Sequence, residues 1–410
     1  MKKCRFGKLT EFGNGSGNAI RCCVIGSLFL LSGCTTGATA SLAPFEVKSD
    51  TGASLAVKPL ATFESPWAMT ALPDGRLLVT EKGGTLWLVD LLDSVSTDSA
   101  DSSSDPVTER TSVSGLPSVR AAGQGGLGDV IVHPDFEQNQ RLYISYVERD
   151  GDLSGAVVAT ATLAQADGVS ASLDSLEIIW RQSPKVTGNG HYGHRMAFSP
   201  DGYLFISSGE RQKFDPAQDM QQNLGKVIRL HADGSVPDDN PFAKQGGIAA
   251  QVWTLGHRNP LGIAFDRNQQ LWVHEMGPRG GDELNLIVAG NNYGYPFVSN
   301  GRHYSGVPIP DHDTRADLQA PAISWTPVIS PSSLVVYTGD RIPGWAGTGV
   351  IGGLSSRALV RVVLDVPATE IERFEMGARI REVEQGPAQS LLLLEDGPGG
   401  RLLLLDAHSQ

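Results

Sequence analysis

A tight turn followed by a short apolar segment recurs along the sequence, and this repeat limits the possible folds more than any other feature. Asp-Gly and Gly-Gly pairs supply the positive φ that hairpin turns require, and segments rich in Val, Leu, Ile and aromatic residues suit strands. Examples are residues 76–80 after Pro73-Asp74-Gly75, residues 85–89 after Gly83-Gly84, residues 203–207 after Asp201-Gly202, and residues 225–230. The helical period of about 3.6 residues is almost absent, so the sequence predicts an all-β protein.

The repeats group into six units, which begin near Trp67, Leu127, Arg195, Leu261, Ser333 and Ile380. Strands in successive hairpins must hide their edges, and radial repetition of small sheets does this. We therefore predict one six-bladed β-propeller over residues 55–410. A pair of β-sandwiches is the alternative, which the even spacing and the lack of a linker disfavour. The Ser- and Asp-rich segment from Asp93 to Asp105 is interpreted as a solvated loop.

The first residues have the parts of an export signal. A basic region precedes an apolar segment at 22–31, which is too short for a permanent membrane helix. It ends in Leu31-Ser32-Gly33-Cys34, which resembles the lipobox of bacterial lipoproteins, where the cysteine sulfur carries the lipid. We expect residues 1–33 to be a signal peptide, Cys34 to be lipidated and residues 34–54 to be a flexible tether. Thr35 then implies the periplasmic side of the outer membrane. An ordinary signal with an incidental cysteine is the alternative.

Cysteine and charge content exclude several classes of function. The four cysteines all fall at or before position 34: Cys4, Cys22, Cys23 and Cys34. The mature domain then has no disulfide, no thiolate metal site and no cysteine nucleophile. Residues 1–33 hold five basic and one acidic residue, so their removal changes the formal charge to −12 − 4 = −16. Such an acidic protein is not expected to bind nucleic acid.

Two glycine-rich loops carry polar side chains without a packing role. Gln124 lies in the segment GQGGLGD at 123–129, where neighbouring glycines let the backbone approach a ligand. An ordinary turn of a β protein is the alternative for this segment. His191 lies in TGNGHYGHR at 187–195 and titrates near neutral pH, which suits a general base. A merely solvated loop histidine is the alternative, and His194 is a second candidate.

The segments GHRNP at 256–260, EMGPRGGDE at 275–283 and NNYG at 291–294 bracket a short apolar strand. Arg258 can neutralise an oxyanion and Asn259 can hydrogen-bond to it. The carbonyl groups of Gly277 and Pro278 are candidate ligands of a hard cation. Asp282 and Glu283 are the nearest carboxylates, and a salt-bridge network at a turn is the alternative.

Arg379 and Arg381 lie two residues apart in the segment GARIRE at 377–382. Alternation along a strand places them on one face, where two guanidinium groups repel unless an anion joins them. A ligand with several carboxylates would satisfy both. The alternative is that two exposed arginines pair with Glu382 and Glu384.

Taken in order, these motifs resemble the soluble quinoprotein glucose dehydrogenase and aldose sugar dehydrogenase family, which are six-bladed propellers that bind pyrroloquinoline quinone (PQQ) and calcium. The resemblance runs from about Trp67 to Asp406. The motifs that carry it are GQGGL, the loop histidine, GHRNP, EMGPRGGDE, NNYGYP, WTPVISPS at 325–332 and the RIRE pair.

The resemblance implies a role for each matching position. His191 is expected to remove the proton of the sugar's anomeric hydroxyl while hydride passes to the quinone. Arg258 is expected to stabilise charge on the quinone oxygen. The remaining implied ligands of the cofactor are Gln124 and Asn259 for the ring and Arg379 and Arg381 for the carboxylates.

The resemblance also implies two calcium sites and shows two departures. The carbonyl groups of Gly277 and Pro278 match the ligands of the calcium that bridges to PQQ, and Glu283 and Tyr293 match a second, structural calcium site. Ser355 stands where family members often have a lysine that contacts the quinone. Arg357, two residues on, is the candidate replacement, although a guanidinium is not equivalent to an ammonium. Met276 stands at a position that is polar in relatives.

The predicted function is therefore PQQ-dependent oxidation of the anomeric carbon of aldoses to lactones by an enzyme of the cell envelope. The electron acceptor is not identified by the sequence. A calcium-dependent lactone hydrolase is one alternative, because propellers with a central calcium host that chemistry too. A non-catalytic propeller that binds a sugar or a partner is another, motivated by Ser355 and Met276.

Overall fold

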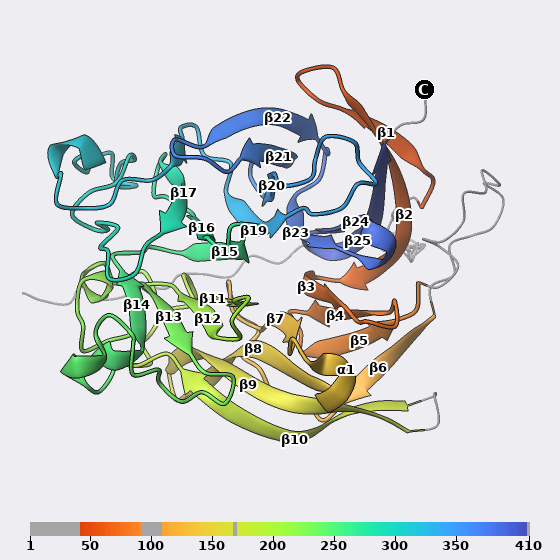
Figure 1. Cartoon of the computed structure of the whole chain (residues 1–410), viewed down its shortest axis with the longest axis horizontal. Coiled ribbons are helices and arrows are strands. Elements are labelled where there is room, and N and C mark those ends of the chain that lie inside the picture. Colours follow the sequence, from red (N-terminus) through yellow and green to blue (C-terminus); the bar gives the residue numbers. More distant parts are fainter. Residues whose placement is uncertain (1–41, 92–108, 167–169, 408–410) are drawn as a thin grey trace, which may run out of the picture. The chain divides into compact units, whose positions relative to one another are not determined.

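Antiparallel sheets succeed one another around a ring in the part of the chain that the computed structural model describes, residues 42–91, 109–166 and 170–407 (Figure 1). All of these residues belong to one unit, Ala40–Gln410. The inner strands are β3 (Pro66–Ala71), β7 (Leu127–Val132), β11 (Gly193–Phe198), β15 (Pro260–Phe265), β19 (Pro331–Val336) and β23 (Ile380–Gln385). Each contacts the next, and β23 contacts β3. The predicted six-bladed β-propeller is confirmed, and every predicted unit begins in an inner strand.

Three or more further strands complete each blade. In the first three blades they are β4 (Leu77–Glu81), β5 (Thr85–Val89), β6 (Arg110–Ser114), β8 (Arg141–Asp150), β9 (Leu153–Ala166), β10 (Ser170–Arg181), β12 (Leu204–Ser208), β13 (Lys226–Leu230) and β14 (Val252–Leu255). In the last three they are β16 (Leu271–Glu275), β17 (Asp282–Ile287), β18 (Ile323–Trp325), β20 (Gly349–Gly353), β21 (Ala358–Val363), β22 (Thr369–Glu375), β24 (Leu391–Glu395), β25 (Pro398–Ala407), β2 (Ser54–Glu64) and β1 (Phe45–Lys48).

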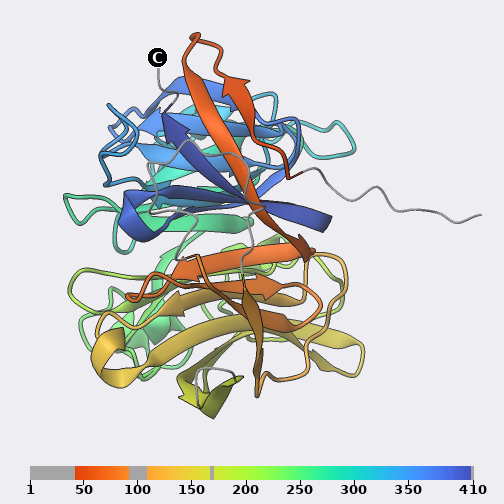
Figure 2. The same ribbon diagram turned by 90° about the vertical axis from the view of Figure 1, so that its right-hand side faces the viewer.

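Two connections between strands depart from a plain series of blades. The parallel pairing of β6 with β10 joins the first two blades into one eight-stranded sheet. The last blade combines both ends of the chain, because β2 pairs antiparallel with β25 (Figure 2). This pairing closes the ring and leaves no inner strand without two neighbours.

The turns form where the sequence places glycine. Gly75 has φ 92° and Gly202 has φ 87°, and both adopt the left-handed conformation that an L side chain disfavours. The predicted segments at 85–89 and 225–230 become β5 and β13 within one residue. Helical structure in the described residues is limited to α1 (Phe136–Asn139) and short 3-10 turns, and no described helix is long and apolar enough to cross a bilayer.

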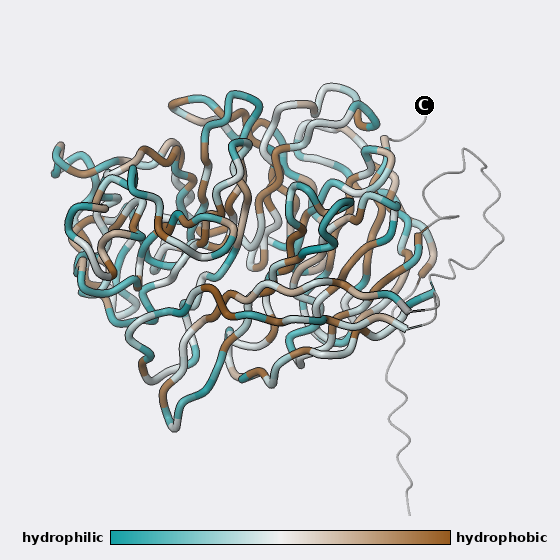
Figure 3. The backbone as a smooth tube through the Cα atoms, turned by 60° about the horizontal axis from the view of Figure 1, so that its bottom comes forward, coloured by the Kyte–Doolittle hydropathy of each residue, from teal (hydrophilic) through white to brown (hydrophobic). Residues whose placement is uncertain are grey.

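The sixth blade shows why its strands are apolar on both faces. Leu391 and Leu393 pack with residues of the fifth blade, whereas Leu392 and Leu394 pack with residues of the first. A blade lies between two neighbours, so successive side chains of one strand bury against opposite sheets. Each fully buried leucine stabilises the fold by about 2 kcal/mol. Hydrophobic stretches of the backbone run through the interior of the molecule, and many peripheral loops are hydrophilic (Figure 3).

The predicted domain boundary at residue 55 is wrong. β1 (Phe45–Lys48) lies inside the segment interpreted as a flexible tether and pairs with β2, with Val47 opposite Leu55. Val47 is buried against the core of the last blade. The Thr/Ala/Ser/Gly-rich composition around these four residues concealed a strand. The predicted signal peptide, Cys34 and the segment from Asp93 to Asp105 lie outside the described residues.

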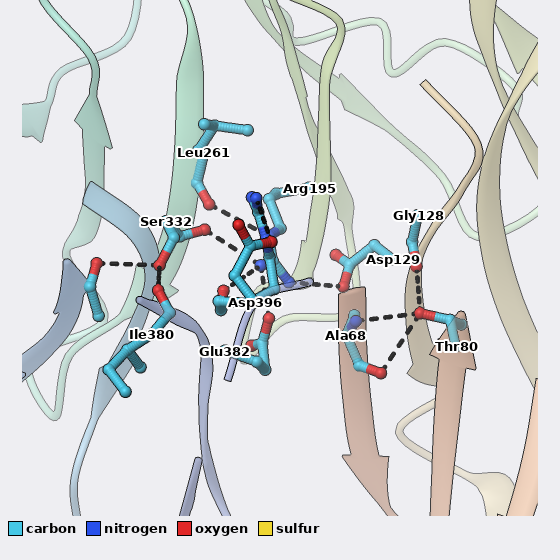
Figure 4. Close-up of polar contacts among 12 residues, drawn as sticks. Ala68, Thr80, Gly128, Asp129, Arg195, Leu261, Ser332, Ile380, Glu382 and Asp396 are labelled. Atoms are coloured by element: carbon cyan, nitrogen blue, oxygen red, sulfur yellow. Dashed lines mark hydrogen bonds and ion pairs between the residues drawn. The ribbon is translucent and has the colours of Figure 1, made fainter. Parts of the chain in front are cut away.

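Arg195 of β11 ties the inner strands together at the ring axis (Figure 4). Its guanidinium lies 3.1 Å from Asp129 of β7 and 2.5 Å from Glu382 of β23 as ion pairs. It also donates to the carbonyl oxygens of Leu261 on β15 and Ser332 on β19, each at 3.1 Å.

The remaining inner strand, β3, contacts the same guanidinium through the indole ring of Trp67. Trp67 lies under Arg195, with 4.1 Å between the ring centroid and Cζ. One side chain therefore contacts the inner strand of every blade. Burial raises the pKa of Glu382 to about 8, because desolvation and Asp129 together outweigh the attraction of Arg195. The sequence marked Arg195 as the start of the third unit but did not predict this axial role.

Candidate active site

A cavity of about 420 Å³ opens at the end of the ring where the inner strands begin. Every blade contributes to its wall: Trp67, Gln124, His194, Leu261, Ser330 and Arg379 come from the six blades in turn. Loops that meet at one end of a propeller bring together residues far apart in sequence. The predicted clusters converge here for that reason.

A second cavity of about 300 Å³ lies beside His191 and Arg258, with Tyr304 on its wall. Its lining is mainly apolar, as in many sites for small molecules. Gln124 links the two cavities, because its Oε1 accepts a hydrogen bond of 2.6 Å from the backbone N of His191. Gln124 thus holds the histidine loop through its carbonyl oxygen.

His191 is a buried histidine in a strained backbone conformation. Its φ is 50° and its side chain is 7% exposed. Nδ1 lies 2.5 Å from Oε1 of Glu210. A carboxylate at Nδ1 favours the tautomer that carries its proton there, so Nε2 remains as the proton acceptor. Burial lowers the pKa of His191 below 6.5, although Glu210 acts against this shift.

Glu210, the carboxylate that contacts His191, was not predicted from the sequence. It is fully buried, and its Oε2 accepts hydrogen bonds from the backbone N of Lys213 and of Phe214. Burial raises its pKa, but His191 and the backbone N of Phe214 outweigh that effect, so the pKa of Glu210 is lowered overall. The signal in the sequence was an acid directly after the apolar strand β12, in a loop of the blade that carries His191.

Arg211 supports the loop that carries His191, and it was likewise not predicted from the sequence. It is 1% exposed, and it donates to the carbonyl oxygens of Ser154 at 2.6 Å, Gly188 at 2.7 Å and Gly190 at 2.9 Å. Its guanidinium stacks on Tyr192 at 3.8 Å from the ring centroid. A planar group with several fixed donors can hold three carbonyl groups at once. Arg211 therefore fixes the backbone that leads into His191 and packs on the ring of Tyr192 directly after it.

His194 is held inside the wall of the first cavity. Its Nδ1 lies 2.7 Å from Oγ of Ser145, and its ring stacks on Trp67 at 5.0 Å. Burial, followed by Arg195 and Arg211, lowers its pKa to about 3. The ring is neutral at physiological pH and is engaged in packing, in contrast to His191 beside its carboxylate.

Arg258 and Asn259 lie together at the start of β15. Arg258 is 5% exposed, and its Nη1 donates to the carbonyl oxygens of Met276 at 2.8 Å and Gly277 at 2.7 Å. Asn259 is fully buried, and neither its Nδ2 nor its Oδ1 has a partner among the described residues. An unpaired buried amide is costly and indicates a group that a ligand satisfies.

The two arginines before and within β23 are joined by a carboxylate of the protein itself. Nε of Arg379 and Nε of Arg381 each donate to Asp396 at 2.8 Å. The alternative pairing with Glu382 and Glu384 is wrong, because Glu382 pairs with Arg195. Asp396 lies in the turn between β24 and β25, too far along the sequence for the strand pattern to reveal it.

The loop from Met276 to Asp282 gathers backbone oxygens. A Cβ on Gly277 would lie 2.2 Å from the carbonyl oxygen of Gly281 and 2.4 Å from that of Gly280. Oδ1 of Asp282 accepts from the backbone N of Gly277 at 2.8 Å. Pro278 lines the second cavity beside Arg258. A concentration of carbonyl oxygens matches the ligands that hard cations prefer.

Glu283 and Tyr293, the predicted second calcium site, line one small cavity together. The hydroxyl of Tyr293 donates to the carbonyl oxygen of Leu286 at 2.6 Å, so it has a structural partner. Burial and the neighbouring Glu275 raise the pKa of Glu283 well above its usual value. Two buried carboxyl groups that repel each other are satisfied by a proton or by a cation.

The residues that depart from the family pattern, Ser355, Arg357 and Met276, lie at different places relative to the first cavity. Oγ of Ser355 lies 2.7 Å from Oγ of Ser330 at the cavity edge. Arg357 does not line the first cavity, whereas Met276 does. Position 357 therefore does not supply a positive charge to this wall.

The fold and the site define a propeller whose ring end holds a buried histidine–carboxylate pair beside an arginine-rich cavity, an arrangement suited to proton removal and anion binding. Residues 63–404 match the family model described as Glucose / Sorbosone dehydrogenase. The chain belongs to this family, and the sugar dehydrogenase class predicted from the sequence is confirmed.

Individual relatives agree with this assignment. The chain is 37% identical to aldose sugar dehydrogenase YliI of Escherichia coli K12 over 350 residues, which cover 83% of this chain and 89% of the relative. The crystal structure of the soluble aldose sugar dehydrogenase of Escherichia coli in the apo-form matches with a TM-score of 0.78 at 35% identity, covering 86% of this chain and 99% of that one. The PQQ-bound form of the Streptomyces coelicolor enzyme matches with a TM-score of 0.67 at 25% identity, covering 89% and 99%.

Proposed function

We propose that the protein oxidises the anomeric carbon of aldose sugars to lactones with PQQ as the cofactor. The observation that carries this proposal is the buried pair of His191 and Glu210, which lines the apolar cavity and is joined to the arginine-rich one through Gln124. The first cavity suits a flat anionic cofactor, and the second suits a sugar.

The residues of the first cavity fit PQQ in size, charge and hydrogen bonding. A volume of about 420 Å³ lies within the range of cofactor sites. Arg379 and Arg381 line this cavity and would hold the carboxylates of PQQ. Asn259 does not line this cavity, but its buried, unpaired amide is proposed to hydrogen-bond to the ring. Gln124 would contact the ring as well, through the NH₂ group that its bond to His191 leaves free. When bound, PQQ supplies the acceptor for the hydride that leaves the anomeric carbon.

His191 acts as the general base in this proposal. Nε2 accepts the proton of the anomeric hydroxyl, while Nδ1 keeps its hydrogen bond to Glu210. The carboxylate stabilises the imidazolium that forms. Arg258 lines the second cavity together with His191 and is placed to stabilise negative charge on an oxygen there. Phe214 and Tyr304 give the second cavity an apolar wall, and both are solvent-exposed, so a bound sugar would cover them.

Calcium is the second proposed cofactor. The carbonyl oxygens of Gly277 and Pro278 would hold it, because backbone oxygens suit this cation. The carbonyl oxygen of Gly277 accepts from Arg258 in this structure, so calcium would share that oxygen with the guanidinium. When bound, Ca²⁺ supplies positive charge that makes a neighbouring cofactor carbonyl more electrophilic. Glu283 and Tyr293 would contribute to a separate structural site.

We further propose that residues 1–33 direct export and that Cys34 carries a lipid, which places the enzyme on the periplasmic side of the outer membrane. The enzyme would then touch the membrane only through its anchor and pass electrons to an acceptor in the envelope. Metabolic labelling with a radioactive fatty acid tests this directly. Label on the wild-type protein and not on Cys34→Ser supports the anchor, and equal label on both contradicts it.

Calorimetric titration of PQQ into the calcium-loaded protein, followed by a dye-linked assay with glucose and other aldoses, tests the function. We expect binding, and we expect His191→Ala to lower kcat/KM by about 10²- to 10⁴-fold. His133→Ala is the control, because His133 follows the end of β7 and lines neither cavity. Turnover of lactones without PQQ would indicate a hydrolase instead. Sugar binding that His191→Ala leaves unchanged, with no turnover, would indicate a binding protein.

A further inference from the structure

The arginine-rich cavity holds a third cation that the family pattern did not indicate. Lys82 follows β4 directly and lines the cavity of about 420 Å³ together with Arg379 and Arg381. Asp396 is the only carboxylate among the described residues of that wall. His194 is neutral there. Three cations against one carboxylate leave two positive charges for a ligand to neutralise.

The backbone of Lys82 is fixed from several sides. Its N donates to the carbonyl oxygen of Ser65 at 3.0 Å, and its own carbonyl accepts from the N of Leu127 at 3.2 Å. A Cβ on Gly126 would lie 2.3 Å from the carbonyl oxygen of Lys82, so that glycine permits the close approach. The side chain therefore starts from a defined point between the first and second blades.

The ammonium group itself is held at the cavity wall. Nζ donates to the carbonyl oxygen of Gly123, next to Gln124, at 2.9 Å. An ammonium has three donors, so this bond leaves others for a ligand. Burial lowers the pKa of Lys82, and the positive charge of Arg381 lowers it further. The two cations repel each other across the cavity, and an anion between them relieves that repulsion.

We propose that Lys82 is a cofactor-binding residue that contacts a carboxylate of the bound ligand opposite the arginine pair. The assignment rests on the proposed function where it names PQQ, and on the cavity alone where it names a polycarboxylate. Lys82 supplies from the first blade the ammonium that Ser355 does not supply from the fifth. Ser355 is tied to Ser330 through its short hydroxyl and carries no charge.

Tryptophan fluorescence provides the test, because Trp67 lines the cavity and a bound quinone or aromatic acid will quench it. Two probes are titrated into the full-length protein: PQQ, and pyridine-2,4,6-tricarboxylate, which has no quinone. Lys82→Met removes the charge and keeps the length of the side chain, and Lys82→Arg keeps the charge. Lys185→Met is the matched control, since Lys185 pairs with Glu148 at the surface.

We expect Lys82→Met to raise the Kd of both probes by about tenfold or more, as for loss of a charge-assisted hydrogen bond. Lys82→Arg should restore most of the affinity, and Lys185→Met should bind as the wild type does. The affinity of Lys82→Met should also depend less steeply on salt. An unchanged melting temperature of the unliganded variant shows that the fold is intact.

Equal Kd values for wild type and Lys82→Met, with weakened binding by Arg381→Met, would overturn the assignment of Lys82. If the wild type does not bind PQQ but binds the tricarboxylate in a Lys82-dependent way, the proposed cofactor fails while the role of Lys82 stands. If PQQ binds to the wild type and to Lys82→Met with the same Kd, the proposed cofactor stands while the role of Lys82 fails. The two proposals therefore fail separately.

Discussion

Replacing Arg195 by methionine tests the axial contact that joins the six blades. Arg195→Met keeps most of the volume but leaves Asp129 and Glu382 buried without their cation. Removing one partner of a buried ion pair costs about 3–5 kcal/mol. The carbonyl groups of Leu261 and Ser332 lose a donor as well, so we expect a loss of about 4 kcal/mol or more.

Thermal unfolding converts this free energy into a temperature. A domain of about 350 residues has an unfolding entropy of about 0.7 kcal/mol/K near its midpoint. A loss of about 4 kcal/mol therefore lowers the melting temperature by about 5–6 °C. Arg76→Met is the control, because Arg76 pairs with Asp74 at the surface, where such pairs contribute at most about 1 kcal/mol.

The loss of unfolding free energy in Arg195→Met should be larger at higher pH. The pKa of Glu382 lies near 8 in the folded protein, above the ordinary value of 4.5, so the folded state binds the extra proton between these values. At pH 6 the carboxyl group is neutral with or without Arg195, and the variant loses less. At pH 9 the wild type ionises Glu382 beside Arg195, whereas the variant must bury that charge alone or take a proton from alkaline solution. A melting temperature that falls equally at both pH values, or by less than about 1 °C at pH 9, would refute the reasoning.

Three further predictions follow from the site and the fold. Burial lowers the pKa of His191 below 6.5, although Glu210 opposes this shift, so the acid limb of kcat/KM should lie below pH 6.5. In Glu210→Gln the acid limb should move to still lower pH, as a pH–rate profile will show. Arg211→Lys keeps the charge but loses the planar guanidinium that reaches the carbonyl groups of Ser154, Gly188 and Gly190 together, so kcat/KM should fall by about 10- to 100-fold without a shift of the pH profile. Val47→Asp places a charge in the core of the last blade and should lower the melting temperature, whereas Lys48→Asp, on the exposed face of β1, should not; equal effects would contradict the packing of β1.

The sequence was sufficient for the fold because its signals are local. Asp74-Gly75 and Asp201-Gly202 specify their own turns, and each adjacent apolar segment becomes a strand of the expected blade. β1 escaped prediction because four residues in a Thr/Ala/Ser/Gly-rich segment carry little periodicity of their own. Their strand is specified by the edge of β2, which is a tertiary contact.

The site was predictable in its members but not in its pairings. The sequence singled out His191, Arg379 and Arg381 by their unusual density of charge. It did not reveal that Glu210 and Asp396 are the carboxylates that meet them, since each partner reaches the site through a separate turn. Loops converge at a ring end only after the blades have packed, so such pairings depend on the whole fold.

The pairing of β2 with β25 means that the sheet of the last blade cannot be completed until the end of the chain has been synthesised. More than 330 residues separate the end of β2 from the start of β25, so the first long strand to be synthesised waits for the last one. At about 5–20 residues per second, the edge of β2 stays unpaired for roughly 15–70 seconds. During that interval the unpaired edge of β2 is exposed to neighbouring chains, and in a chain that ends before Pro398 this edge is never paired. Premature termination close to the C-terminus should therefore yield aggregates, although five blades are already complete.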